Sequence, residues 1–151
     1  MEPPDEDFAA KKSLFYRGIA RLPLHALGFE HRAVLEKHRN LSNENVARLE
    51  KIYEQVGCSR LEEENVINAV VEDGDLLAAL TTVCMSLDEM RQLRWPQDAP
   101  ALNLEKVQCL SGMHRIAAAR RFLTENDKWW IVRLFSSSES FVRLPILHYL
   151  I

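Results

Sequence analysis

The chain has 151 residues, of which 47% are apolar, so it can bury the core of a single domain. Its formal net charge of −3 argues against a general nucleic-acid coat protein. The sequence has no signal-peptide pattern and no apolar run of membrane-spanning length, and its cysteines form no CxxC pair. We therefore expect an intracellular protein, cytoplasmic or nuclear, without membrane contact or structural metal.

The first forty residues predict little regular structure. Residues 1–12 are rich in acidic side chains and predict a disordered acidic lead. Residues 19–22 predict a first strand, which Pro23 ends or confines to a sheet edge. Residues 25–41 contain His25, His31 and His38 without an HExxH pattern, which favours a solvated basic face over a metal site.

A helix and a strand follow. Ser42 is a typical helix N-cap, and Gly57 is a typical residue for the position that ends a helix at its C-terminus. The spacing predicts one buried face, made of Val46, Leu49, Ile52, Tyr53 and Val56. Residues 66–71 are rich in β-branched side chains and predict a strand.

Residues 72–103 predict a helical insertion. Asp73 and Gly74 predict a turn, and a helix should begin at Asp75. Its buried stripe is predicted to consist of Leu76, Leu77, Leu80, Val83 and Cys84. Ser86 and Glu89 form a capping box that starts a further short helix, which ends near Trp95. A loop at 97–103 closes the insertion.

The last third predicts a strand at 104–110, a helix at 113–123 and a strand at 129–135. Because side chains alternate along a strand, one of Trp129 and Trp130 should lie in the core. An apolar tail runs from Phe141 to Ile151 and predicts a shortened chain or a surface for self-association or a protein partner. The order of elements indicates an α/β fold with a mixed sheet.

The segment 104–123 carries the clearest functional signal. It predicts a strand, a turn of Ser111 and Gly112, and a helix that begins with His114 and Arg115. A helix start has free N–H groups and a partial positive charge, so basic residues there are locally unfavourable unless an anion joins them. The pattern is therefore typical of a phosphate site.

Residues 109–119, C-L-S-G-M-H-R-I-A-A-A, resemble the phosphate-binding box of the ParB/sulfiredoxin superfamily. A closer similarity is to an uncharacterised fungal ParB-like family with a G-x-H-R-I-x-A-A box and a D-x-W-W strand, here Asp127, Trp129 and Trp130. The resemblance covers about residues 17–135 and implies a mixed sheet with flanking helices in a domain at 13–140. It implies a fold more than a reaction, since no activity is established for that fungal family.

The resemblance implies that Ser111, Gly112, Met113, His114 and Arg115 bind nucleotide phosphates, with a nucleoside triphosphate and Mg²⁺ as the ligand. Arg60 and Asn65 are further candidates, because family members contact nucleotide near that strand. Met113 stands where sulfiredoxin has its catalytic cysteine, and a thioether cannot act as a thiolate, so reductase activity is not expected. ParB's box glutamate is also absent, which places nucleotide hydrolysis in doubt.

Three of the box residues also have a structural interpretation. Gly112 could approach a phosphate, supply a positive φ, or do both. Arg115 could bind phosphate or form a salt bridge with Glu105 or Glu125. His114 could donate to phosphate or shuttle a proton, as a tentative catalytic residue, or it could be half-buried and bonded to backbone.

Three functions stay open at this level. The leading hypothesis is a nucleotide- or phosphate-binding ParB-like domain that could be associated with DNA. The second is a nuclease or phosphotransferase, which needs a carboxylate near the box from Glu62, Glu63, Glu64 or Asp73. The third is a catalytically degenerate interaction module. No helix-turn-helix pattern follows the domain, so sequence-specific DNA reading is not predicted.

Overall fold

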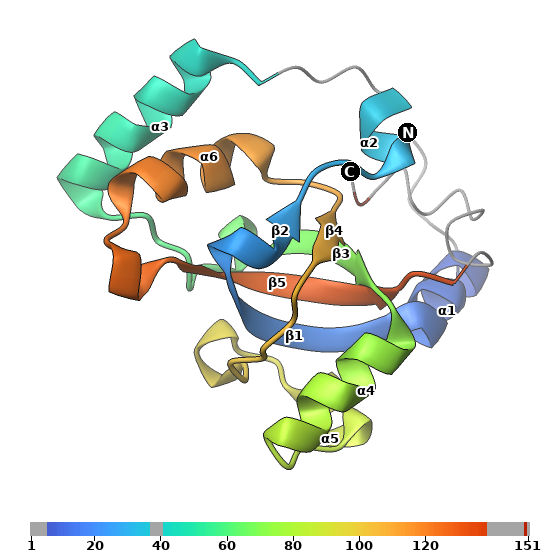
Figure 1. Ribbon diagram of the computed structural model, residues 1–151. Coiled ribbons are helices and arrows are strands. Elements are labelled where there is room, and N and C mark those ends of the chain that lie inside the picture. Colours follow the sequence, from blue (N-terminus) through green and yellow to red (C-terminus); the bar gives the residue numbers. More distant parts are fainter. Residues whose placement is uncertain (1–5, 37–40, 139–149, 151) are drawn as a thin grey trace.

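The computed structural model describes residues 6–36, 41–138 and 150, and in this part a five-stranded mixed sheet forms the centre of the fold (Figure 1). Its strands are β1 (Tyr16–Pro23), β2 (Leu27–Gly28), β3 (Ile67–Val71), β4 (Val107–Cys109) and β5 (Trp129–Ser136). They lie in the order β1-β5-β3-β4-β2. The β1–β5 and β3–β4 pairs are antiparallel, whereas β3–β5 and β2–β4 are parallel. This confirms the predicted α/β fold with a mixed sheet.

The helices flank this sheet. They are α1 (Glu6–Phe15), α2 (Arg32–Glu36), α3 (Asn43–Val56), α4 (Asp73–Thr82), α5 (Leu87–Gln92) and α6 (Met113–Phe122). Helices α3 and α6 lie side by side above the sheet in Figure 1, and α4 and α5 lie below it, near β1. Short 3-10 turns join the elements at Leu24–Ala26, Glu63–Asn65, Pro96–Asp98 and Glu125–Asp127. Among the helices of the described residues, none has the length and apolar character to span a membrane.

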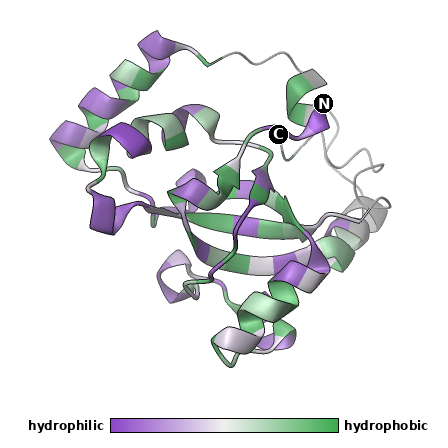
Figure 2. Cartoon of the chain, in the orientation of Figure 1, coloured by the Kyte–Doolittle hydropathy of each residue, from purple (hydrophilic) through white to green (hydrophobic). Residues whose placement is uncertain are grey.

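The core lies between the sheet and its helices. Trp130 is fully buried, and its indole N–H donates to the backbone oxygen of Asn65 at 2.9 Å, so the prediction that one tryptophan of the pair is in the core is confirmed. Ala118 and Ala119 are also fully buried, which brings α6 close to the sheet. Figure 2 shows hydrophobic residues along the central strands and many hydrophilic ones on α3.

The capping predictions are confirmed because they depend on local chemistry. The Ser42 hydroxyl accepts from the Asn45 N–H at 3.2 Å, and Gly57 ends α3 with φ +82°. The predicted buried face of α3 is only partly correct. Val46 and Tyr53 are buried, but Val56 is 73% exposed because the last turn of α3 extends beyond the surface it covers.

Helices α4 and α5 lie within the predicted insertion at 72–103, and the Ser86 hydroxyl caps α5 by accepting from the Glu89 N–H at 3.1 Å. Helix α4 begins at Asp73 rather than Asp75, because the Asp73–Gly74 pair forms its first turn. The predicted stripe was wrong for three residues. Leu77, Val83 and Cys84 are exposed, although they were predicted to be buried. Ala79, which was not predicted, is buried on α4.

Two boundary predictions were also wrong. Residues 6–12 belong to α1 rather than to a disordered lead, while residues 1–5 lie outside the described part. The predicted strand at 104–110 is shortened to β4, although Leu104 is buried beside it. Of the predicted tail at 141–151, only Leu150 is described. It is buried, and its backbone oxygen accepts from the Asn68 side-chain amide at 3.2 Å.

Candidate functional site

The turn between β4 and α6 is fixed by hydrogen bonds to β3. The Leu110 N–H donates to the Asn68 oxygen at 2.7 Å, and the Ser111 hydroxyl accepts from the Asn68 N–H at 3.1 Å. Gly112 then adopts a left-handed conformation with φ +84°, and a Cβ there would overlap Ile67. Glycine is therefore required both for the backbone conformation and for the close packing.

Helix α6 starts directly at this turn, without a side-chain cap. The first hydrogen bond of the helix is donated by the Ile116 N–H to the Gly112 oxygen at 3.0 Å. The N–H groups of Met113, His114 and Arg115 therefore have no acceptor within the helix. Together with the helix dipole, they make this end of α6 electropositive.

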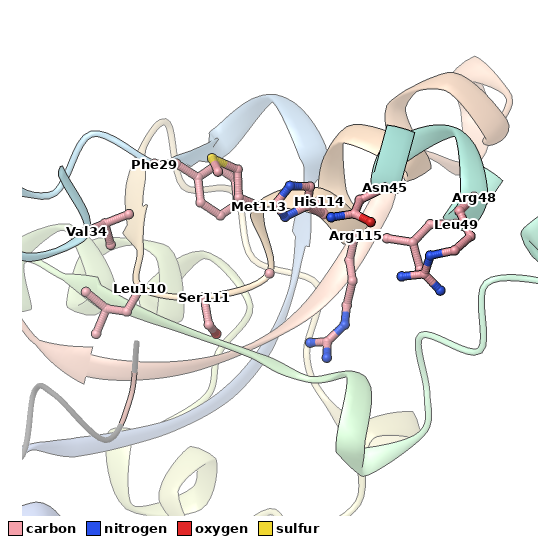
Figure 3. Close-up of a pocket in the computed structure, with 11 residues that line it drawn as sticks. Phe29, Val34, Asn45, Arg48, Leu49, Leu110, Ser111, Met113, His114 and Arg115 are labelled. Atoms are coloured by element: carbon pink, nitrogen blue, oxygen red, sulfur yellow. The ribbon is translucent and has the colours of Figure 1, made fainter. Parts of the chain in front are cut away.

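A pocket of about 380 Å³ opens at the start of α6 (Figure 3). The β4–α6 turn forms one wall, α3 forms the second, and the segment around β2 and α2 forms the third. The lining residues are Phe29, Val34, Asn45, Arg48, Leu49, Leu110, Ser111, Gly112, Met113, His114 and Arg115. The structure thus brings together all five residues of the predicted box. Helices α4 and α5 contribute none of the lining.

His114 connects two helices. Its Nε2 accepts from the Ser42 N–H at 3.0 Å, and Ser42 is itself the N-cap of α3. A ring nitrogen that accepts is unprotonated, so the neutral imidazole carries its proton on Nδ1. His114 is thus a half-buried histidine bonded to backbone through its Nε2, as its structural interpretation predicted. Only its Nδ1–H is left to donate to a ligand.

Arg115 has a different environment. It is half-buried and forms no hydrogen bond or ion pair with the described part of the chain. The predicted structural alternative, a salt bridge to Glu105 or Glu125, is not formed, and Glu125 pairs instead with Lys128 at 2.8 Å. In Figure 3 the guanidinium extends away from the His114 ring, so the two groups do not converge on one point.

Helix α3 contributes a second cation, which the sequence did not single out. Arg48 lines the same pocket, and it also forms no ion pair with the described residues. Asn45 lies one turn earlier on α3. The polar spacing of α3 could have identified both residues as one helix face, but which pocket they line depends on the packing of α3 against α6.

The further candidates Arg60 and Asn65 do not line the pocket. Arg60 donates to the backbone oxygens of Asp127 and Trp129 at 2.7 and 3.1 Å and to the Asp127 carboxylate at 2.8 Å. Its guanidinium also lies 3.3 Å from the Trp129 ring centre. The Asn65 side chain donates to the Ser59 oxygen at 3.0 Å. Both side chains therefore hold neighbouring segments in place.

Among the described residues, neither a thiol nor a carboxylate lines this pocket. Cys109 is fully buried, and burial raises the pKa of its thiol to about 12. The described lining contains no carboxylate, since Glu62, Glu63, Glu64 and Asp73 all lie elsewhere. Within the described residues, no group of three or more histidine, cysteine or acidic side chains is arranged to hold a metal ion.

Comparison with known protein families assigns this chain to one of them. Residues 15–145 match the family described as the N-terminal domain of a protein of unknown function, DUF3723, and the chain belongs to that family. No curated protein and no solved structure matches the chain.

Proposed function

We propose that this chain is a nucleotide-binding domain that captures the phosphate groups of a nucleoside triphosphate between α3 and the start of α6. One observation carries the proposal: two arginines without ion-pair partners among the described residues, Arg48 and Arg115, line a single pocket that has no described carboxylate. Arg115 is half-buried, where an unpaired cation is unfavourable until an anion binds, whereas Arg48 is exposed and adds a solvated cation to the lining. The resemblance of the box to the ParB/sulfiredoxin superfamily supports the same ligand class.

The pocket offers a different surface to each part of such a ligand. Arg48, Arg115 and the free N–H groups of α6 suit phosphate oxygens, and a guanidinium can bind them in a bidentate manner. Phe29, Leu49 and Met113 give the same pocket an apolar wall for a nucleoside. A Mg²⁺ ion carried by the triphosphate would be held by phosphate and water, because the described lining offers it no carboxylate.

The proposal assigns binding and no reaction. A nuclease or phosphotransferase needs a carboxylate to activate water or hold metal ions at the site, and the described lining supplies none. The alternative of an interaction module depended on residues 141–151, which lie outside the described part except for Leu150.

Calorimetric titration with CTP, ATP and GTP tests the proposal. We expect at least one of them to bind, and we expect Arg115→Ala to weaken that binding by roughly tenfold to a hundredfold, because charge-assisted hydrogen bonds are lost. Arg121→Ala is the matched control. It removes the same charge from the exposed face of α6 and should leave the affinity unchanged.

Thermal unfolding of each variant separates loss of binding from loss of fold. A folded Arg115→Ala protein that binds as tightly as the unmodified chain would overturn the proposal. Negligible heats for all of the triphosphates would overturn it as well.

A further inference from the structure

A second pocket lies near the opposite edge of the sheet. Its volume is about 430 Å³, and it lies where α5 and the segment after it meet β1 and β5. Strand β1 is one edge of the sheet, whereas the nucleotide pocket adjoins β4 and β2 at the other. Its lining residues are Tyr16, Ile19, Glu63, Val66, Arg91, Leu93, Arg94, Trp95, Pro96 and Arg133.

The lining is strongly cationic. It contains Arg91, Arg94 and Arg133 against a single acid, Glu63. None of these arginines forms an ion pair with the described residues. Arg91 donates to the Ser13 backbone oxygen at 2.9 Å, and Arg133 donates to the Asn68 amide oxygen at 3.1 Å. These neutral acceptors orient the two guanidinium groups, of which Arg91 is exposed to solvent and Arg133 is half-buried, and they add no negative charge.

The charges of two of these arginines, Arg133 and Arg91, reach neighbouring groups. Burial and the charge of Arg133 lower the pKa of Lys12. Burial raises the pKa of Tyr16, and the charges of Arg133 and Arg91 oppose that rise. Both effects place additional polar groups within electrostatic reach of the arginines. A bound anion would relieve the repulsion between the cations.

An aromatic surface accompanies these charges. Trp95 lines the same pocket and is 62% exposed, and it makes no ring contact with the described residues. Its backbone is held by the turn that follows, in which the Asp98 N–H donates to the Trp95 oxygen at 2.9 Å. Pro96, the next residue, is buried. The indole is thus an exposed flat face on a fixed stretch of chain.

We propose that this second pocket binds single-stranded nucleic acid, with phosphates on the arginines and a base stacked on Trp95. Guanidinium groups match phosphate geometry, and an exposed indole is the usual platform for an unpaired base. An acidic peptide would use the same cations but has no need of the indole, so we favour the nucleic acid. The proposal does not depend on the nucleotide pocket, since the two pockets share no lining residue.

Fluorescence anisotropy with a labelled single-stranded oligothymidylate at low salt tests this inference. We expect binding that weakens as salt rises, and we expect Trp95→Ala and Arg94→Ala each to weaken it on the order of tenfold. Both side chains are exposed, so the variants should fold, which thermal unfolding checks. Arg121→Ala is the control, because it removes an exposed charge that lines neither pocket, and it should leave the oligonucleotide affinity unchanged.

Competition separates the sources of the anion. Unlabelled oligonucleotide should displace the probe, whereas free thymidine monophosphate should do so only at much higher concentration, because it supplies a single phosphate. Absence of binding at low salt would overturn the proposal. Binding that Trp95→Ala does not change, or equal displacement by polyglutamate, would also overturn it, the latter in favour of an acidic peptide.

Discussion

Two arginines that the sequence marks as candidates for the same site have opposite environments in the structure. The Arg60 side chain is only 11% exposed, and it donates to two backbone oxygens and to the Asp127 carboxylate. Arg115 lines an open pocket and has no hydrogen bond or ion pair with the described residues. Both are cations near a strand end, so residue type alone does not separate them.

The difference between them is the degree to which their donors are satisfied. Arg60 also stacks on Trp129, and the guanidinium of Arg21 lies 3.8 Å from the centre of the same ring. The charge and donors of Arg60 are therefore satisfied within the protein, without a ligand. Arg115 retains all of its donors for something outside the described chain. A half-buried guanidinium with unused donors is therefore the better indicator of a binding site than its position in a motif.

The largest expected effect is on the turn that presents Arg115. Gly112→Ala should lower the free energy of unfolding by roughly 2–5 kcal/mol, because a left-handed backbone costs about 1–2 kcal/mol without glycine and Ile67 must also move. Urea unfolding measures this. Gly74→Ala is the matched control, with an ordinary φ inside α4 and room for a Cβ, and it should be neutral or slightly stabilising. Equal stabilities for the two variants would show that the turn is not constrained as described.

The second expected effect separates the two arginines directly. Arg60→Ala should lower the free energy of unfolding by about 2–3 kcal/mol, since two backbone oxygens lose their donor and Trp129 loses a stacked cation. Arg115→Ala should change it by about 0.5 kcal/mol or less. Chemical unfolding of both variants under the same conditions gives the comparison. If the two costs were equal, Arg115 would have a structural role.

The sequence predicted the parts of the fold that depend on neighbours along the chain. Ser42 and Ser86 cap helices because a hydroxyl reaches the N–H three residues later, and Gly57 ends α3 by its own conformation. The sequence also predicted that one of Trp129 and Trp130 lies in the core, and it is Trp130, on a strand that is buried over most of its length. These signals act over a few residues and survive in any tertiary setting.

The parts that the sequence did not predict depend on distant contacts. His114 bonds to Ser42, which is 72 positions away, and Arg48 joins the pocket only because α3 packs beside α6. The same reason explains why Arg60 was a misleading candidate, since its partner Asp127 is 67 positions away. The five box residues are consecutive and line one pocket, but which of them have free donors could be read only from the folded chain.

The smallest expected effect concerns the ion pair between Arg60 and the Asp127 carboxylate. The hydrogen bond from Arg60, with the charge of Arg60 and a bond from Trp129, holds the pKa of Asp127 below its usual range, although burial opposes the shift. A carboxyl whose pKa is lowered by folding adds stability above its unfolded pKa of about 3.9, and that stability is lost as the pH falls through the lower folded value. The difference in stability between the unmodified chain and Arg60→Ala should therefore be constant near neutral pH and shrink below about pH 4.

Some of that difference should persist in acid, because the bonds from Arg60 to the two backbone oxygens and its stacking on Trp129 do not titrate. Among the described residues, the other carboxyl groups with a lowered pKa are Asp73 and Glu125, which pair with Arg17 and Lys128, so their contributions cancel between the two proteins. Urea unfolding across the acid range measures the difference. A gap that stays constant from neutral pH to about pH 3, with both proteins still folded, would mean that the carboxylate of Asp127 adds nothing and that the bonds to backbone oxygens hold Arg60 by themselves.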